Sequence, residues 1–266
     1  MTRLFDALRR SHSAGAKTPL APVPLASAPS SPATRARKPV LELASAPVEA
    51  ARRSIVSCPP AAALPADVAK EMAGLRIRLE AMLTDRVPRV VMFLASQGGE
   101  GTSTVTAQFA QSLAADPGLR VLVVDVHARR PAYAPGGRSR VRLAGPPASG
   151  NGGGASAAPR ADLMPVPEAV AAAGGAAPRV LHGILEAVGG GYDWILLDGP
   201  PVLESPDAAS LGQVADGVVV VVQAGRTKRP VLARAVDLAG RSGGRVIGMV
   251  LNRRRLEIPE FIYRRI

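Results

Sequence analysis

Hydrophobic residues in the second half of this chain fall into short continuous runs, and the segments between the runs have helical spacing. Runs rich in Val, Ile and Leu are typical of buried strands, whereas apolar residues at every third or fourth position indicate amphipathic helices. The strands are predicted at residues 90–94, 120–125, 161–165, 192–198, 217–223 and 245–251. The helices are predicted at residues 66–84, 103–113, 179–188, 207–211 and 231–239. Strands that alternate with helices predict an α/β fold with a mostly parallel, doubly wound sheet.

The first quarter of the chain shows no lasting period. Residues 1–10 favour a short amphipathic helix, with a frayed terminus as the alternative. Residues 11–65 are rich in Ala, Pro and Ser and are predicted to be a disordered tether. Residues 66–266 are the predicted folded domain, with a Gly- and Pro-rich mobile insert at about 132–160.

The composition limits the partners and the compartment. A formal net charge of +12 favours acidic partners such as nucleic acid, anionic lipid or phosphate compounds. An Arg- and Ala-rich composition also arises from high genomic GC content, so specific nucleic-acid binding is not expected. The single cysteine excludes an internal disulfide framework and suits a reducing cytoplasm. Because no apolar run approaches the roughly 20 residues of a membrane span, we expect a cytoplasmic protein that is soluble or in peripheral contact with a membrane.

A glycine-rich turn follows the first strand of the domain. Gly98, Gly99 and Gly101 let the backbone adopt positive φ and turn its N–H groups inward, and the helix that begins near Ser103 adds the positive end of its dipole. Such a loop binds phosphate oxygens. In the usual phosphate loop, the last glycine is followed by Lys and then by Ser or Thr. Here Thr102 takes the place of the Lys, while Ser103 keeps the hydroxyl that holds Mg²⁺.

Two later strands each end on an acid, Asp125 and Asp198. Ligands of parallel sheets bind beyond the carboxyl ends of the strands. An acid that ends an apolar strand after a phosphate loop is the pattern of a Walker B residue, which binds the water shell of Mg²⁺. Arg129 and Arg130 follow Asp125 at the same edge, and either one is a candidate for the missing positive charge. The sequence therefore predicts a site for ATP or ADP with Mg²⁺.

These motifs together resemble the bacterial tyrosine-kinase family of capsular and exopolysaccharide synthesis, within the wider group that contains the ParA and MinD ATPases. GGEGTST resembles the family's PGEGKST loop, and VLVVDVHARRP resembles its second acidic motif. YDWILLDGPPVLESPDA resembles the pattern YDxVIIDxPPVxxxxDA, and the segments GVVVVVQAGRTKR and IGMVLNR also match. The resemblance covers the chain from about residue 66 to its end and implies a P-loop domain.

In that family the domain binds ATP with Mg²⁺ and pairs with a membrane polysaccharide co-polymerase that activates it. Rings assemble, and tyrosines in the tail are phosphorylated by the neighbouring subunit. The resemblance therefore implies a co-polymerase partner, a homo-oligomer and a place at the inner face of the plasma membrane. The implied nucleotide contacts are Gly98, Gly99, Glu100, Gly101, Thr102, Thr104, Arg129 and Asn252. The implied Mg²⁺ ligands, in part through water, are Ser103, Asp125 and Asp198.

The chain departs from the family pattern at functional positions. Thr102 replaces the catalytic Lys, His127 replaces the second acid of the second motif, and Tyr263 remains of the tail's tyrosine cluster. The helix that makes ring contacts in relatives keeps Arg76. Loss of one preorganised group in such a site costs about 3 kcal/mol in the transition state. We therefore expect a kinase-like regulator of polysaccharide assembly that binds nucleotide weakly or not at all and has impaired catalysis.

Two alternatives stay open. The first is an active ATPase or tyrosine autokinase that uses an atypical cation, for which Asp198→Ala would abolish hydrolysis. The second is a positioning ATPase of the ParA or MinD type, acting on membrane or nucleoid through its basic surface. Such ATPases usually carry a signature Lys early in the loop, at the position of Gln97, and its absence here counts against them.

Overall fold

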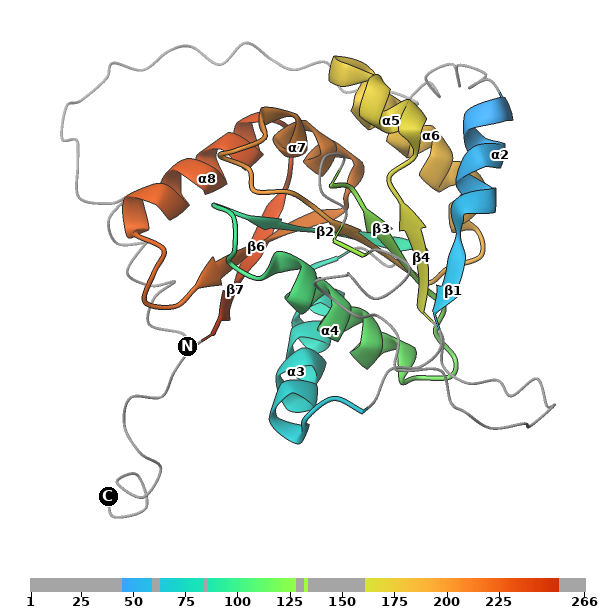
Figure 1. The fold of residues 1–266 in the computed structure, drawn as a ribbon. Helices are drawn as coiled ribbons and strands as arrows, with labels where there is room; N and C mark the ends of the chain where they lie inside the picture. The colour runs from blue at the N-terminus through green and yellow to red at the C-terminus, as the bar shows by residue number, and fades with distance from the viewer. Residues whose placement is uncertain (1–44, 59–62, 84–85, 128–131, 134–160, 254–266) are drawn as a thin grey trace, which may run out of the picture. The chain divides into compact units, whose positions relative to one another are not determined.

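Seven strands form one sheet in the order β1-β4-β3-β5-β2-β6-β7 (Figure 1). The structure is a computed structural model that describes residues 45–58, 63–83, 86–127, 132–133 and 161–253. All neighbouring strands are parallel except β1, which runs antiparallel to β4. The strands are β1 Val56–Cys58, β2 Arg89–Ala95, β3 Val121–Asp125, β4 Ala161–Pro165, β5 Trp194–Asp198, β6 Gly217–Gln223 and β7 Val246–Asn252. The predicted α/β fold with a mostly parallel sheet is confirmed.

Helices cover both faces of the sheet, as Figure 1 shows. Helices α3 and α4 pack on one face, whereas α2 and α5 to α8 contribute buried side chains to the other. The helices are α2 Ser45–Ser54, α3 Ala66–Met82, α4 Thr102–Ala114, α5 Glu168–Ala172, α6 Ala177–Gly189, α7 Pro206–Leu211 and α8 Arg229–Arg241. This two-sided cover explains why the central strands are apolar at nearly every position.

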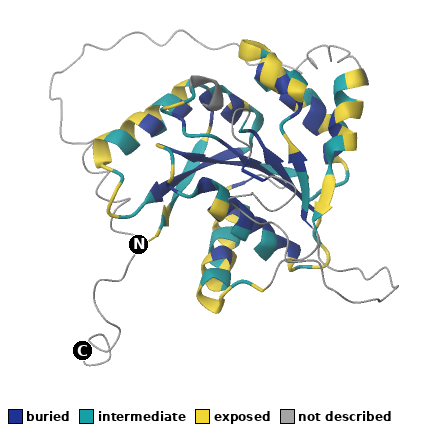
Figure 2. Ribbon diagram, in the orientation of Figure 1, coloured by how far each residue is buried: buried dark blue, intermediate teal, exposed yellow. Residues whose placement is uncertain are grey.

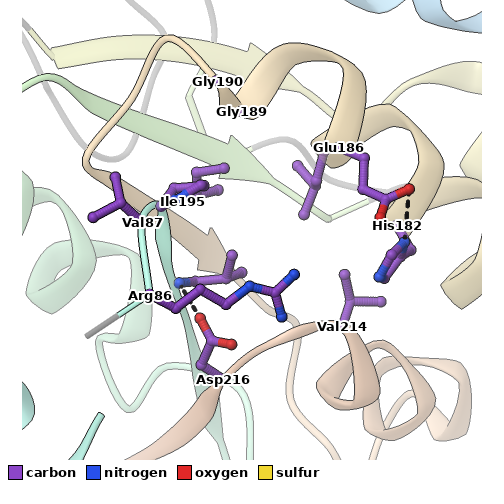
Figure 3. Close-up of a pocket in the computed structure, with 12 residues that line it drawn as sticks. Arg86, Val87, His182, Glu186, Gly189, Gly190, Ile195, Val214 and Asp216 are labelled. Atoms are coloured by element: carbon purple, nitrogen blue, oxygen red, sulfur yellow. Dashed lines mark hydrogen bonds and ion pairs between the residues drawn. The ribbon is translucent and has the colours of Figure 1, made fainter. Parts of the chain in front are cut away.

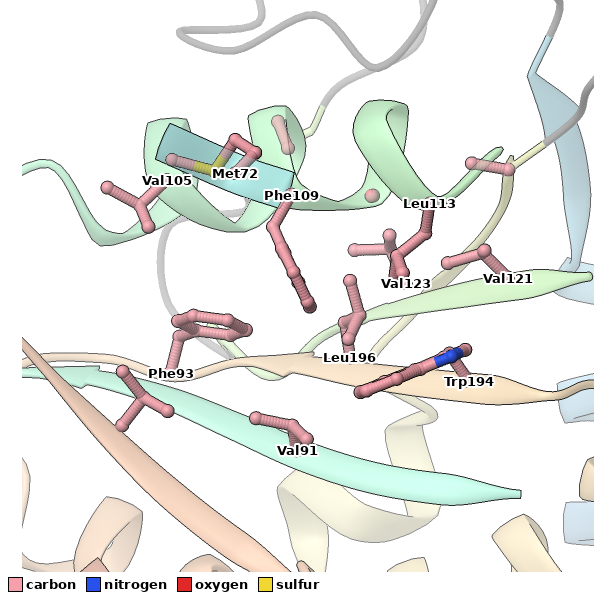
Figure 4. Close-up of a cluster of buried hydrophobic side chains, with 14 of the residues drawn as sticks. Met72, Val91, Phe93, Val105, Phe109, Leu113, Val121, Val123, Trp194 and Leu196 are labelled. Carbon is pink, nitrogen blue, oxygen red and sulfur yellow. The ribbon is translucent and has the colours of Figure 1, made fainter. Parts of the chain in front are cut away.

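Side chains of each central strand alternate between two hydrophobic clusters. Along β2, Phe93 enters the cluster under α3 and α4, and Met92 enters the cluster on the opposite face. In the first cluster the Phe109 ring lies 5.8 Å from the Phe93 ring and 5.8 Å from the Trp194 ring (Figure 4). The buried strands sandwiched between half-exposed helices stand out in Figure 2. This packing fixes the positions of β3 and β5, whose last residues are Asp125 and Asp198.

The predicted tether, residues 11–65, is wrong over its last part. Ser45–Ser54 form α2 and Val56–Cys58 form β1. β1 pairs with the edge of β4, with Val56 opposite Leu163, and Ala51 of α2 is buried against the sheet. Elements this short gain their stability from tertiary pairing, so Ala- and Pro-rich composition concealed them.

Other boundaries moved by at most two residues, and some expectations lie outside the described residues. Helix α3 ends at Met82 rather than residue 84, and α8 begins at Arg229 rather than residue 231. The N-terminal helix predicted at residues 1–10, nearly all of the 132–160 insert, and the tail with Tyr263 lie outside the described residues. Among the described residues, no helix combines the length and the apolar character needed to cross a membrane.

Candidate functional site

The glycine-rich loop joins β2 to α4 at the carboxyl edge of the sheet. Gly99 has φ 84° and Gly101 has φ 93°, values in the left-handed region that favours glycine. Gly101 is the residue before α4, and no side chain caps the first turn of that helix. The N–H groups of that first turn therefore stay available, which is the geometry of an anion-binding loop.

Glu100 braces this loop from within. Its side chain is buried, and its carboxylate accepts hydrogen bonds from the backbone N–H groups of Ser96 at 2.6 Å and Gln97 at 3.1 Å. The Thr227 hydroxyl also donates to it. Glu100 was predicted to contact the nucleotide. In the structure its carboxylate instead accepts hydrogen bonds that stabilise the loop.

Asn252, at the end of β7, supports the same loop from the side. Its amide nitrogen donates to the Glu100 carbonyl at 2.9 Å, and its amide oxygen accepts from the Arg253 N–H at 2.8 Å. A Cβ at Gly101 would collide with this amide, so the close approach requires glycine at position 101. Asn252 therefore holds the turn in place.

The first residues of α4 differ in exposure. Thr102, at the lysine position, is buried, whereas Ser103 is half-buried and Thr104 is exposed. The Thr102 carbonyl accepts a hydrogen bond from the Thr106 hydroxyl at 3.0 Å. A buried threonine at this point brings no positive charge to the phosphate loop.

Asp125 and Asp198 lie side by side, because they are register partners at the ends of the parallel strands β3 and β5. The Asp125 carboxylate is well satisfied. It accepts hydrogen bonds from the backbone N–H groups of His127 at 3.0 Å, Ala132 at 2.6 Å and Tyr133 at 3.3 Å. These donors fix the orientation of Asp125 toward the site.

Asp198 has the opposite environment. It is fully buried, and neither carboxylate oxygen accepts a hydrogen bond within the described part of the chain. Burial raises the pKa of Asp198 to about 7, although the positive charge of His127 and the nearby Ser103 and Tyr133 hydroxyls oppose the shift. A buried carboxylate without a partner is costly to the fold, which points to a ligand as the missing partner.

His127 and Tyr133 complete the cluster. The His127 Nδ1 atom lies 2.9 Å from an Asp125 oxygen and 3.8 Å from an Asp198 oxygen. Burial lowers the pKa of His127, but the hydrogen bond to Asp125 and the charges of both acids outweigh it and raise the pKa overall. Tyr133 is buried, and its hydroxyl donates to the Ser103 carbonyl at 3.1 Å, which ties the acid edge to α4. Sequence reasoning missed Tyr133, because nothing in the pattern after Pro131 indicated that the chain folds back.

Glu204, in the turn after β5, was also missed. Its carboxylate accepts a hydrogen bond from the Gly98 N–H at 2.6 Å. This N–H belongs to the predicted phosphate cradle, so a carboxylate of the chain itself accepts the hydrogen bond of one predicted phosphate donor. The segment PPVLESPDA could have indicated this residue, because Glu204 is an acid that comes shortly after the predicted Walker B strand.

Replacing Glu204 with glutamine is expected to raise the affinity for ATP with Mg²⁺ about fivefold, since an exposed charge at this distance contributes roughly 1 kcal/mol or less. The gain should shrink as salt is raised, because salt screens the repulsion between the carboxylate and the phosphates. Titration at two ionic strengths measures it. Glu186→Gln, an exposed glutamate on α6, is the matched control and should leave the affinity unchanged. Equal affinities for Glu204→Gln and wild type would show that the carboxylate does not compete with phosphate.

Of the arginines that were singled out from the sequence, the structure describes Arg76 and not Arg129 or Arg130. Arg76 on α3 forms ion pairs within its own chain, with Glu80 at 2.9 Å and with Asp116 at 3.3 Å. Two arginines that the sequence did not single out lie at the loop instead: Arg253 donates to the Gly99 carbonyl at 3.2 Å, and the Arg226 guanidinium lies beside Gly99.

A separate hollow of about 360 Å³ lies at the opposite edge of the sheet, near the start of β2 and β5 (Figure 3). Its charged side chains are partly engaged with the protein. His182 Nδ1 lies 3.6 Å from a Glu186 oxygen, and Asp216 accepts the Val90 N–H at 2.8 Å. The acids and the phosphate loop are at the carboxyl edge, so this hollow is not part of the candidate site.

Comparisons with known proteins find bacterial tyrosine kinases. No family model matches the chain. The chain is 27% identical over 191 residues to the tyrosine-protein kinase CpsD of Streptococcus agalactiae, an alignment that covers 66% of this chain and 80% of CpsD. It is 27% identical over 192 residues to the tyrosine-protein kinase YwqD of Bacillus subtilis strain 168, covering 68% of this chain and 79% of YwqD.

The fold also matches a solved structure. The kinase domain of the Escherichia coli tyrosine kinase ETK superposes with a TM-score of 0.51 at 17% identity, covering 72% of this chain and 79% of that domain. At this identity the likeness concerns the fold, while the two curated relatives match in sequence across most of their length. The chain is thus similar in sequence to bacterial tyrosine-protein kinases and shares the fold of a bacterial tyrosine-kinase domain.

Proposed function

We propose that this chain is a kinase-like regulatory protein of capsule or exopolysaccharide assembly, with impaired catalysis and weak nucleotide binding. Its partner would be a membrane polysaccharide co-polymerase, as the sequence resemblance implies. The observation that carries the proposal is the state of the phosphate loop: its backbone turns are intact, but Thr102 is buried where the lysine belongs. Glu204 adds a negative charge to the same loop.

The residues present fit a magnesium nucleotide in part. Phosphate oxygens and a cation require three features that this site offers: the left-handed glycines, the uncapped start of α4, and an Asp198 carboxylate that accepts no hydrogen bond from the described residues. When bound, Mg²⁺ neutralises phosphate charge and the nucleotide supplies the phosphoryl group. In this proposal the loop N–H groups bind phosphate oxygens, the Ser103 hydroxyl is a cation ligand, and Asp198 and Asp125 orient the surrounding water.

The cost of the missing lysine decides the catalytic part of the proposal. Each preorganised cation or donor aimed at the transferring phosphoryl group is worth about 3 kcal/mol, or a hundredfold to a thousandfold in rate. The site lacks the lysine and has a histidine in place of the second acid, so two such groups are changed. Nucleotide binding depends less on one charge, because several backbone N–H groups share the phosphates.

An active enzyme with an atypical cation is the second candidate, and a specific observation favours it. Arg226 and Arg253 both lie beside Gly99, on the loop itself. Arginine guanidinium groups bind phosphate oxygens in two-point geometry, so either side chain has the chemistry to replace lysine. Loss of ATP turnover in both Arg226→Ala and Arg253→Ala would support this candidate, whereas turnover at background level in wild type excludes it.

The test of the proposal is phosphate release from ATP with Mg²⁺ by the full chain. We expect wild type to release phosphate no faster than Asp198→Ala, which lacks the strand-end acid. Turnover by wild type that clearly exceeds that of Asp198→Ala would overturn the proposal in favour of the active enzyme.

A further inference from the structure

We propose that Asp125, His127 and Asp198 form a binding site for one divalent transition-metal ion, of which Zn²⁺ and Co²⁺ are the probes, in preference to Mg²⁺. The three residues each offer a ligand atom, and these atoms all lie within 4.8 Å of one another. The inference shares Asp125 and Asp198 with the magnesium site of the proposed function, but it needs no nucleotide, so metal binding to the nucleotide-free chain tests it separately.

The distances in the cluster suit a small tetrahedral ion. Two ligand atoms bound to the same Zn²⁺ at its usual bond length lie about 3.4 Å apart. In the structure the His127 Nδ1 atom is 2.9 Å from Asp125 and 3.8 Å from Asp198, which brackets that value. The two histidine distances each differ from that value by about half an ångström, and the two carboxylate atoms lie within 4.8 Å of each other. Modest side-chain rotations would therefore bring the three atoms onto one ion.

The unpartnered Asp198 carboxylate independently points to a cation. Both of its oxygens are buried and accept no hydrogen bond from any residue that the structure describes, although polar groups in protein interiors are nearly always paired. A metal ion bound to one Asp198 oxygen would supply the missing interaction. Neighbouring side chains fill this role only in part: the His127 Nδ1 atom lies 3.8 Å from an Asp198 oxygen, and the Tyr133 hydroxyl donates to the Ser103 carbonyl.

Asp125 supplies a ligand that is already held in place. Three backbone N–H groups, from His127, Ala132 and Tyr133, orient its carboxylate. Such outer hydrogen bonds fix the direction of a ligand and are worth tenfold to a hundredfold in metal affinity at known sites. The position of His127, two residues after Asp125, lets both residues face the same point.

The imidazole sets the preference among ions. Mg²⁺ binds oxygen ligands in octahedral geometry, whereas imidazole suits Zn²⁺, Co²⁺ and similar ions. An acid at position 127, as in the family pattern, would make the ligand set all oxygen. His127 therefore converts the edge of the sheet from an all-oxygen set to a mixed nitrogen and oxygen set. With three protein ligands, the ion keeps at least one coordination position open, beside Ser103.

The test is metal binding by the full chain, without an affinity tag and without nucleotide. Zn²⁺ affinity is measured by competition with a chromogenic chelator, and Co²⁺ binding by its visible absorption. We expect one Zn²⁺ per chain in wild type and a loss of about 100-fold or more in His127→Asn, which removes a ligand rather than an outer hydrogen bond. His127→Asp should lower the affinity for Zn²⁺ relative to Mg²⁺.

Two matched controls separate this site from other metal-binding groups. His182→Asn removes the exposed histidine that lies near Glu186, and Cys58→Ser removes the only thiol. Both should keep wild-type Zn²⁺ affinity. The circular dichroism of His127→Asn and His127→Asp shows whether each variant folds, and either folded variant is sufficient. The proposal is overturned if wild type binds no Zn²⁺, if a folded His127 variant binds it as tightly as wild type, or if a control variant loses it.

Discussion

Thr102→Lys is expected to raise the affinity for ATP with Mg²⁺ by about 30-fold, because a hydrogen bond from a charged donor contributes roughly 2 kcal/mol. The backbone that would receive the phosphates is already formed. Gly99 and Gly101 adopt the required positive φ, and α4 begins without a side-chain cap. The variant therefore adds a charge to a preformed loop, and titration calorimetry on the full chain measures the gain.

A second variant at the same position isolates the charge. Thr102→Met has nearly the length of lysine, so it imposes the same change of packing at a buried position without a cation. We expect Thr102→Met to bind nucleotide no better than wild type. If Thr102→Lys and Thr102→Met gave equal affinities, the missing lysine would not be what weakens the site.

Asp198→Asn is expected to stabilise the protein at pH 8, although it alters the candidate site. The buried carboxylate lacks a hydrogen bond, and burial raises its pKa from 3.8 to about 7. Between these values the native state binds more protons than the unfolded state, so the free energy of unfolding falls as pH rises through this window. Each pKa unit corresponds to about 1.4 kcal/mol. Asparagine abolishes this loss, and we expect a gain of about 2 kcal/mol at pH 8 and a smaller one at pH 5.

The raised pKa of His127 has the same effect as that of Asp198, so both groups should lower the free energy of unfolding of wild type as pH rises. For His127, the raised pKa means that the protonated form stabilises the fold below about pH 6.5, and this contribution disappears as pH rises through the folded pKa. Urea denaturation at pH 5 and pH 8 measures the effect for wild type and Asp198→Asn. The raised pKa of Asp198 would be contradicted if Asp198→Asn were less stable than wild type by the same amount at pH 5 and at pH 8.

Asp125→Asn is the matched control with the opposite expected sign. Asp125 pairs in register with Asp198, but its carboxylate accepts three backbone hydrogen bonds. An amide presents only one acceptor oxygen, so the variant leaves buried N–H groups without a partner. Each such group costs about 1–3 kcal/mol, and Asp125→Asn should therefore destabilise the fold.

The sequence was sufficient to predict the parts of the site that follow from strand order. Asp125 and Asp198 each end an apolar run, and parallel strands bring their carboxyl ends to one edge, so their proximity could be inferred. The glycine positions predicted the turn for the same kind of local reason, since positive φ restricts the residue type. The α/β fold followed from the alternation of strand and helix patterns.

Most of the remaining contacts join residues that are far apart in the sequence, and no local sequence pattern predicts them. Tyr133 reaches Asp125 through its backbone N–H, a group that every residue except proline carries. Glu204 accepts a hydrogen bond from Gly98 across 106 residues, and Glu100 accepts one from the Thr227 hydroxyl across 127 residues. β1 and α2 were hidden because their stability comes from pairing with β4 and packing on the sheet, not from their own periodicity.

The central claim, that catalysis is impaired in a loop of intact shape, is tested most directly by phosphotyrosine formation. The full chain is incubated with ATP and Mg²⁺, and phosphotyrosine is quantified for wild type beside Asp198→Ala. The account predicts that the two are indistinguishable, because neither can stabilise the transferring phosphoryl group. Robust phosphorylation at Tyr263 in wild type that Asp198→Ala abolishes would contradict it.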